Sequence, residues 1–280
     1  MKTLLLVSAM TIAAVTSATM AAVPRDGQFG GPSTKNFTAP QVFQAAGPTA
    51  ASLQGVMDQF RLAIGGNNNG NAAGLNSGRR EINWDGGGST ATTESPTPFN
   101  GFLANRGALF ATTGTGFVQA TVQGLATEFG NATYETEFKA FTLSRLFSPV
   151  NSNITETTFF VPGSGVNGAN PTPALTSAFG AVFSDVDQPD GSGPGNKRGN
   201  RGASTLIQFF GSKGELLFSS FVPASPGQGT FTFFGIVYSD PRIASVRILA
   251  GDEAPGPNDE FGRDIVMMDD FIYGEPRIGG

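Results

Sequence analysis

Most of the chain after residue 100 consists of short runs in which apolar and polar residues alternate. The clearest run is 243–249, where Ala244, Val246 and Ile248 alternate with polar Ser245 and Arg247. Alternation with a period of two puts one face of a strand against a core and the other in solvent. Because such runs recur at about ten-residue spacing, the pattern predicts an all-β fold, an antiparallel β-sandwich or jelly roll.

The strand pattern is most regular in the second half of the chain. The strands expected there cover 177–184, 204–210, 215–222, 230–238, 243–249 and 264–276. The turn segment 211–214 between two of these runs predicts a β-hairpin. Strands expected in the first half cover 102–103, 108–112, 116–122, 138–143, 145–147 and 157–161. The Pro/Gly/Asn-rich segment 162–173 marks a candidate boundary inside a sandwich domain that covers 48–276.

One segment has the periodicity of an amphipathic helix. Its apolar residues share one face at spacings of three and four: Leu53, Val56, Met57, Phe60 and Ile64. Thr49 is a suitable N-cap and Gly65 a suitable end, which predicts a helix over 49–64. Since its polar face is not basic, we expect it to pack on the sheet rather than on a membrane.

The first residues have the features of an export signal. Lys2 is followed by a short apolar run and then by small residues, which predicts a signal peptide over 1–21 and a flexible leader over 22–47. Residues 277–280 form a short tail. No later segment approaches the roughly 18 apolar residues that span a bilayer, so no transmembrane segment is expected in the mature chain. We therefore expect a secreted protein, extracellular or periplasmic.

Composition excludes several kinds of chemistry. The chain has no His and no Cys, which removes His- or Cys-based nucleophiles, disulfides and the usual zinc sites. The formal net charge is −5, which argues against nucleic acid as a partner. A secreted, cysteine-free chain also suggests a bacterial source.

A dense polar cluster surrounds the only tryptophan. Arg80, Glu81, Asn83, Trp84 and Asp85 lie within six residues. In a ligand-binding interpretation, Trp84 offers a stacking face and its neighbours bind a polar ligand such as a sugar. In a packing interpretation, Trp84 fills the core and an Arg–carboxylate pair holds the loop.

Acidic residues in two distant segments suggest a cation site. An oxygen-rich loop carries Asp185, Asp187 and Asp190, and the closing strand carries Asp269 and Asp270 inside an apolar run. Alternate acids followed by Gly are typical of structural calcium loops, although the spacing departs from the EF-hand. Because a buried acid needs a partner, we expect the closing strand to lie beside 182–187 and one of its acids to complete the site.

The segment 78–86 and the closing residues 266–276 together resemble a family of uncharacterised secreted bacterial proteins with an RREINWDG segment and a closing MDDFIYGEP strand. The resemblance implies a fold grouping over nearly the whole mature chain and no activity. The C-terminal half is loosely similar to lectin-like, carbohydrate-binding jelly rolls, some of which hold structural calcium at an Asp-Asp pair before an aromatic residue.

These observations favour a secreted, non-catalytic binding or surface module. Carbohydrate is the leading ligand class, with an extracellular glycan or cell-surface component as partner and structural Ca²⁺ as cofactor. One alternative is a glycan hydrolase that uses two carboxylates, for which Glu81, Asp85, Glu94, Asp269 and Asp270 are candidates. Another is a structural matrix or envelope protein that binds no small ligand.

Overall fold

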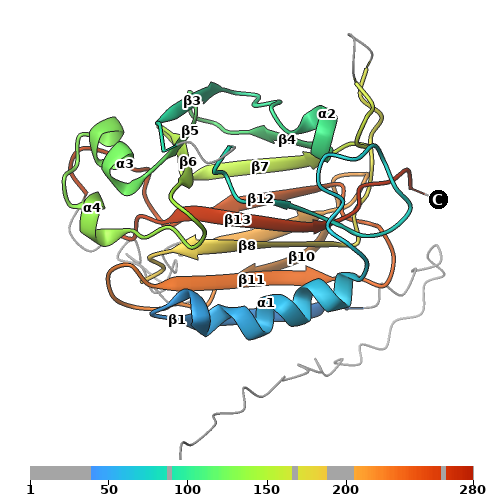
Figure 1. Cartoon of the computed structure of the whole chain (residues 1–280), viewed down its shortest axis with the longest axis horizontal. Helices are drawn as coiled ribbons and strands as arrows, with labels where there is room; N and C mark the ends of the chain where they lie inside the picture. The colour runs from blue at the N-terminus through green and yellow to red at the C-terminus, as the bar shows by residue number, and fades with distance from the viewer. Residues whose placement is uncertain (1–38, 87–89, 166–169, 188–204, 260–262, 280) are drawn as a thin grey trace, which may run out of the picture. The chain divides into compact units, whose positions relative to one another are not determined.

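The structure is a computed structural model that describes residues 39–86, 90–165, 170–187, 205–259 and 263–279. These residues fold as an antiparallel β-sandwich, which confirms the predicted fold class (Figure 1). Sheet A comprises β1 (Gln41–Gly47), β2 (Arg79–Ile82), β3 (Thr93–Pro96), β5 (Gly116–Ala120), β6 (Leu146–Val150), β8 (Ala178–Ser184), β11 (Phe231–Val237) and β13 (Met267–Gly274). Sheet B comprises β4 (Ala108–Ala111), β7 (Ile154–Phe159), β9 (Leu206–Phe210), β10 (Leu216–Phe221) and β12 (Ser245–Leu249).

Both sheets interleave strands from the two halves of the sequence. Sheet A runs β1-β11-β8-β13-β6-β5-β3, with β2 also paired to β13, and sheet B runs β10-β9-β12-β7-β4. Because β13 lies beside β6 and β12 lies beside β7, each half of the chain completes sheets begun by the other. The segment 162–173 therefore does not separate two sandwiches.

The core between the sheets is rich in phenylalanine. Phe179 of β8 and Phe271 of β13 face Phe209 of β9 and Phe159 of β7 in one buried cluster. The ring centroids of Phe179 and Phe209 lie 6.5 Å apart, so side chains of the two sheets meet directly. Aromatic pairs of this kind add to the free energy gained from burying their area.

The predicted helix is present as α1 (Ala50–Ile64). It lies along β1 and β11 in Figure 1, and its buried Leu53, Met57 and Phe60 pack on the outer face of sheet A. Three short helices that the sequence pattern did not predict follow it: α2 (Leu103–Arg106), α3 (Val122–Phe129) and α4 (Tyr134–Glu137).

The helix α3 had a signal that the strand assignment overlooked. Leu125, Ala126 and Phe129 are buried at helical spacing, the Thr121 side chain accepts a hydrogen bond from the Gly124 N–H, and Gly130 ends the helix in a left-handed conformation. The strand expected over 138–143 is also absent, since these residues form a connection between α4 and β6.

The N-terminal leader ends earlier than predicted. Residues 41–47 form β1, an edge strand paired with β11 from Gln41 opposite Val237 to Gly47 opposite Phe231. The predicted signal peptide and the rest of the leader lie outside the described residues. Among the residues that are described, no helix is long and apolar enough to cross a membrane.

Candidate functional site

Arg80, the first member of the polar cluster around Trp84, is fully buried. Arg80 projects from β2 and forms a two-pronged ion pair with Glu275, with Nε–Oε2 and Nη2–Oε1 distances of 2.6 Å. The two side chains are 0% and 1% exposed. The guanidinium also donates to the carbonyl oxygens of Gly70 and Ala72, so this pair fixes the preceding loop to the C-terminal end of β13.

Trp84 lies in the core and offers no face to a ligand. The residue is 1% exposed, and its ring stacks on Phe147 with centroids 3.7 Å apart. Its indole N–H donates to the carbonyl oxygen of Asp269. The expectation of a stacking surface is therefore corrected in favour of the packing interpretation, because the indole is buried against the rings of Phe102, Phe110, Phe147 and Phe271.

The remaining members of the cluster point in different directions. Glu81 accepts hydrogen bonds from Arg61 of α1 and from Arg79. Burial acts to raise the pKa of Glu81, but the two arginines outweigh it and lower that pKa. Asp85 is buried and accepts hydrogen bonds from the backbone of Ser144 and Arg145, whereas Asn83 is exposed. The five residues do not converge on one ligand position.

Asp269 and Asp270, the paired acids of the closing strand, bond the same connection between α4 and β6 that Asp85 bonds. A register shift between Met268 and Phe271 puts both Asp269 and Asp270 opposite a single residue of β8, which is a β-bulge. Asp269 accepts from the Phe141 N–H at 2.6 Å, and Asp270 accepts from the Thr142 hydroxyl at 2.6 Å. Burial, together with the charge of Asp270, raises the pKa of Asp269 well above its usual range.

The predicted contact between the closing strand and residues 182–187 is confirmed. In the antiparallel pairing of β8 and β13, Ser184 lies opposite Met267 and Phe183 opposite Met268. The acids nevertheless do not meet. Asp185 follows Ser184, the last paired residue of β8, whereas Asp269 and Asp270 follow Met268 and therefore lie in the opposite direction along the pair. Asp270 and Asp269 therefore do not complete a site with Asp185.

Asp185 faces a different set of acids. It is 4% exposed, its φ of 71° is left-handed, and its Oδ1 has no hydrogen-bond partner among the described residues. Burial raises the pKa of Asp185 to about 8, and the charges of Asp187, Glu137 and Asp264 add to the shift.

Those neighbours do not by themselves form a metal centre. Asp187 accepts from the Gly227 N–H, and Asp190 lies outside the described residues. Within the described ranges no three His, Cys, Asp or Glu side chains are grouped so that they could hold a metal ion. The calcium site therefore stays a prediction.

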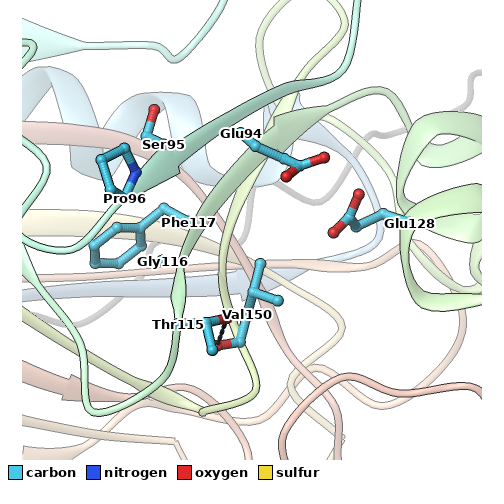
Figure 2. Close-up of a pocket in the computed structure, with 8 residues that line it drawn as sticks. All are labelled: Glu94, Ser95, Pro96, Thr115, Gly116, Phe117, Glu128 and Val150. Atoms are coloured by element: carbon cyan, nitrogen blue, oxygen red, sulfur yellow. Dashed lines mark hydrogen bonds between the residues drawn. The ribbon is translucent and has the colours of Figure 1, made fainter.

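Figure 2 shows a pocket at the β3 edge of sheet A in which two carboxylates point toward each other. Glu94 comes from β3 and Glu128 from α3, and the pocket has a volume of about 380 Å³. Burial raises the pKa of Glu128, and the charge of Glu94 raises it further.

Sheet B presents an open face with a different character. Across its three central strands β9, β12 and β7, Gln208 lies opposite Arg247 and Arg247 lies opposite Glu156, which forms a polar row. The neighbouring row is Phe210, Ser245 and Thr158, in register on the same strands. We call these six residues the open face. All of them are half-buried or exposed, while the residues between them on each strand are buried.

The polar groups of the open face are held in place. Arg247 Nε donates to Glu156 Oε1 at 2.7 Å, and the guanidinium lies 5.8 Å from the centroid of the Phe210 ring. The Arg247 and Glu156 side chains remain 46% and 40% exposed. A hollow of about 270 Å³ lies over Glu156, Phe210, Ser245 and Arg247, so water or a ligand has access to them. The alternating pattern predicted these strands but carried no signal for these residues as a site.

Comparisons with known proteins add little to this picture. No family model and no curated protein matches the chain. Among solved structures, the chain is similar to the K2 cleaved adhesin domain of Lys-gingipain, with 9% sequence identity and a TM-score of 0.35 over 70% of this chain and 98% of that domain. A likeness of this size carries no argument about function. The fold itself defines the class: a cysteine-free antiparallel β-sandwich with one sheet face open to solvent.

Proposed function

We propose that the chain is a secreted, non-catalytic binding module that takes carbohydrate on the open face of sheet B. The observation that carries the proposal is the hydrogen-bonded pair of Arg247 and Glu156 beside the Phe210 ring. The predicted export signal supports an extracellular or periplasmic location.

The open face has the chemistry that a sugar requires. Neighbouring sugar hydroxyls each donate and accept, so they match a guanidinium and a carboxylate fixed side by side. The C–H face of a pyranose is apolar and suits the Phe210 ring. Because Arg247 and Glu156 are already paired, their side chains lose little further conformational freedom when a ligand binds.

The hydrolase alternative has weaker support. Asp85 and Asp269 are buried and accept from backbone N–H groups, and Asp270 is buried and accepts from the Thr142 hydroxyl. Glu81 is engaged by two arginines. Glu94 lines a pocket together with Glu128 and is the candidate acid of the hydrolase alternative that a pocket exposes among the described residues. Because the four other candidate acids are engaged by arginines, backbone groups or a hydroxyl, we favour binding over hydrolysis.

A glycan array tests the proposal directly. We expect wild-type protein to bind a subset of neutral glycans, and Arg247→Ala and Phe210→Ala to weaken that binding about tenfold or more. Arg277→Ala is the matched control, because Arg277 is an exposed arginine that follows β13 of sheet A and is not part of the open face. A blank array with folded wild-type protein, or equal losses in Arg277→Ala, would count against the proposal.

A further inference from the structure

The two rows of the open face continue onto a fourth strand. Leu109 of β4 lies opposite Thr158, and Ala111 of β4 lies opposite Glu156. Both β4 residues are half-buried, whereas the other two residues of that strand are in the core. Directly opposite residues of paired strands share one face of a sheet. The first row therefore comprises Leu109, Thr158, Ser245 and Phe210, and the second comprises Ala111, Glu156, Arg247 and Gln208.

A third row on the same face is apolar. Leu206 of β9 lies opposite Leu249 of β12, which in turn lies opposite Ile154 of β7. All three residues are half-buried. A ligand that ran along the strands would leave the polar row after one step and meet aliphatic side chains, which cannot bond its hydroxyls. A ligand that crosses the strands stays on polar groups from β9 to β7.

The hollow over the open face has the same direction. Its lining includes Glu156 and Thr158 of β7, Ser245 and Arg247 of β12, and Phe210 of β9. The hollow therefore crosses three neighbouring strands. A sheet face contacts a sugar ring from one side only, so it buries less of the ring than an enclosed pocket does, and each ring contributes little binding free energy. Useful affinity on such a face requires several rings.

We infer that the ligand of the open face is an uncharged linear glycan of several sugar units, which lies across the strands between Phe210 and Leu109. The inference rests on the function proposed above and names the form of carbohydrate that suits the site. Three steps separate β9 from β4 in sheet B, and neighbouring strands lie about 4.8 Å apart, so the two side chains are about 14 Å from each other. That span exceeds a single sugar ring, so only a chain reaches both ends.

The two rows match the groups of such a chain. Phe210 and Leu109 offer apolar contact to the C–H faces of the rings at its two ends. The two hydroxyl side chains between them donate and accept, as sugar hydroxyls do. The charges of Arg247 and Glu156 are paired with each other, so the two rows have no excess positive charge with which to hold a polyanionic glycan.

Affinity as a function of chain length tests the inference. The probes are linear oligomers of glucose, xylose, mannose and N-acetylglucosamine, each from the monosaccharide to the hexasaccharide, and calorimetric titration measures their binding. We expect at least one series in which the hexasaccharide binds about tenfold or more tightly than the disaccharide. Equal affinity at every length would overturn the inference and leave the proposed function standing. Binding of none of these oligomers would also overturn it, and the glycan array then decides whether the proposed function falls with it.

Leu109→Thr tests the β4 end of the site. Threonine suits a strand but removes most of the apolar contact. We expect the affinity for the hexasaccharide to fall about three- to tenfold, and the ratio of hexasaccharide to disaccharide affinity to fall with it. Leu62→Thr is the matched control, because Leu62 is an exposed leucine of α1, on the sheet A side. The control should bind as wild type does, and thermal melting should show both variants folded. Unchanged hexasaccharide affinity in Leu109→Thr would overturn the inference.

NMR chemical-shift mapping measures the direction of the bound chain. The disaccharide should shift the amide signals of residues around Phe210 and Arg247, which line the hollow. The hexasaccharide should also shift the signals of Leu109 and Ala111, since these residues continue the two rows on β4. Shifts that spread from Arg247 toward Leu249 instead would show a chain that lies along the strands, and that result would overturn the inference.

Discussion

Sheet A and sheet B share one core but differ in what covers their other face. In sheet A the side chains of β8 alternate between two buried environments, with Phe179, Ala181 and Phe183 in the central core and Ala178 and Val182 beneath α1. In sheet B the alternate residues of β9 and β12 reach solvent. A strand buried on both faces reads as a continuous apolar run, and a strand buried on one face alternates.

The contrast extends to two chemically identical ion pairs. Arg80–Glu275 in sheet A is buried, and Arg247–Glu156 in sheet B is about half exposed. The Arg80–Glu275 pair of sheet A fixes a loop and is closed to any ligand. The Arg247–Glu156 pair of sheet B is in contact with solvent, so its polar groups can bind a ligand. Burial, rather than residue type, separates an anchor from a binding group.

The largest effect is expected when one partner of the buried Arg80–Glu275 pair is removed. Glu275→Ala leaves the Arg80 guanidinium uncompensated inside sheet A, and we expect a loss of about 3–5 kcal/mol in the free energy of unfolding. Urea denaturation measures it. A loss below about 1 kcal/mol would show that Arg80 finds water, and the two pairs would no longer differ in kind.

A medium-sized effect is expected at Asp185, at the end of β8. Its pKa in the folded protein is about 8, above the usual 3.8 of the group, so the folded state keeps a proton that the unfolded chain releases. Stability should therefore fall as the pH rises from about 4 to about 8. Asp185→Asn removes the charge and suits the left-handed backbone. We expect it to stabilise the protein by about 1–3 kcal/mol at pH 8 and to change little at pH 4, as thermal melting at both pH values would show.

The calcium hypothesis predicts that the Asp185 carboxylate stabilises the folded protein instead of destabilising it. A bound Ca²⁺ would neutralise the acids around Asp185, so chelation should lower the Tm of wild type and Asp185→Asn should abolish that shift. Asp269→Asn is the control, because Asp269 bonds the Phe141 backbone and lies away from Asp185. A melting curve that chelator leaves unchanged would remove calcium from the account.

The smallest effect on stability is expected for the exposed ion pair of sheet B. Glu156→Ala breaks a half-exposed pair on the open face, and we expect a change below about 1 kcal/mol in the free energy of unfolding. The same variant should lose glycan binding, because Arg247 is no longer held beside Phe210. Large destabilisation with binding retained would reverse the roles assigned to the two sheets.

Local pattern was sufficient for the elements whose signal lies within a few residues. Alternation located β12, the turn 211–214 located the β9–β10 hairpin, and three- and four-residue spacing located α1. Local pattern gave a wrong prediction for the connection 138–143, whose apolar residues resemble a strand. Buried Asp269 bonds its backbone at Phe141, and buried Asp270 bonds the Thr142 hydroxyl. Local pattern also missed α3, a short helix in which helical spacing covers barely two turns.

The sequence alone determined that this chain is built from antiparallel strands with one long helix at the start, and that it lacks thiol and imidazole chemistry. Only the tertiary structure decided which charges are buried and which are free. Arg80 finds Glu275 at a separation of 195 residues, and Asp269 finds the Phe141 N–H at a separation of 128. Periodicity tells which face of a strand is apolar, but the order of strands in a sheet decides what lies against that face.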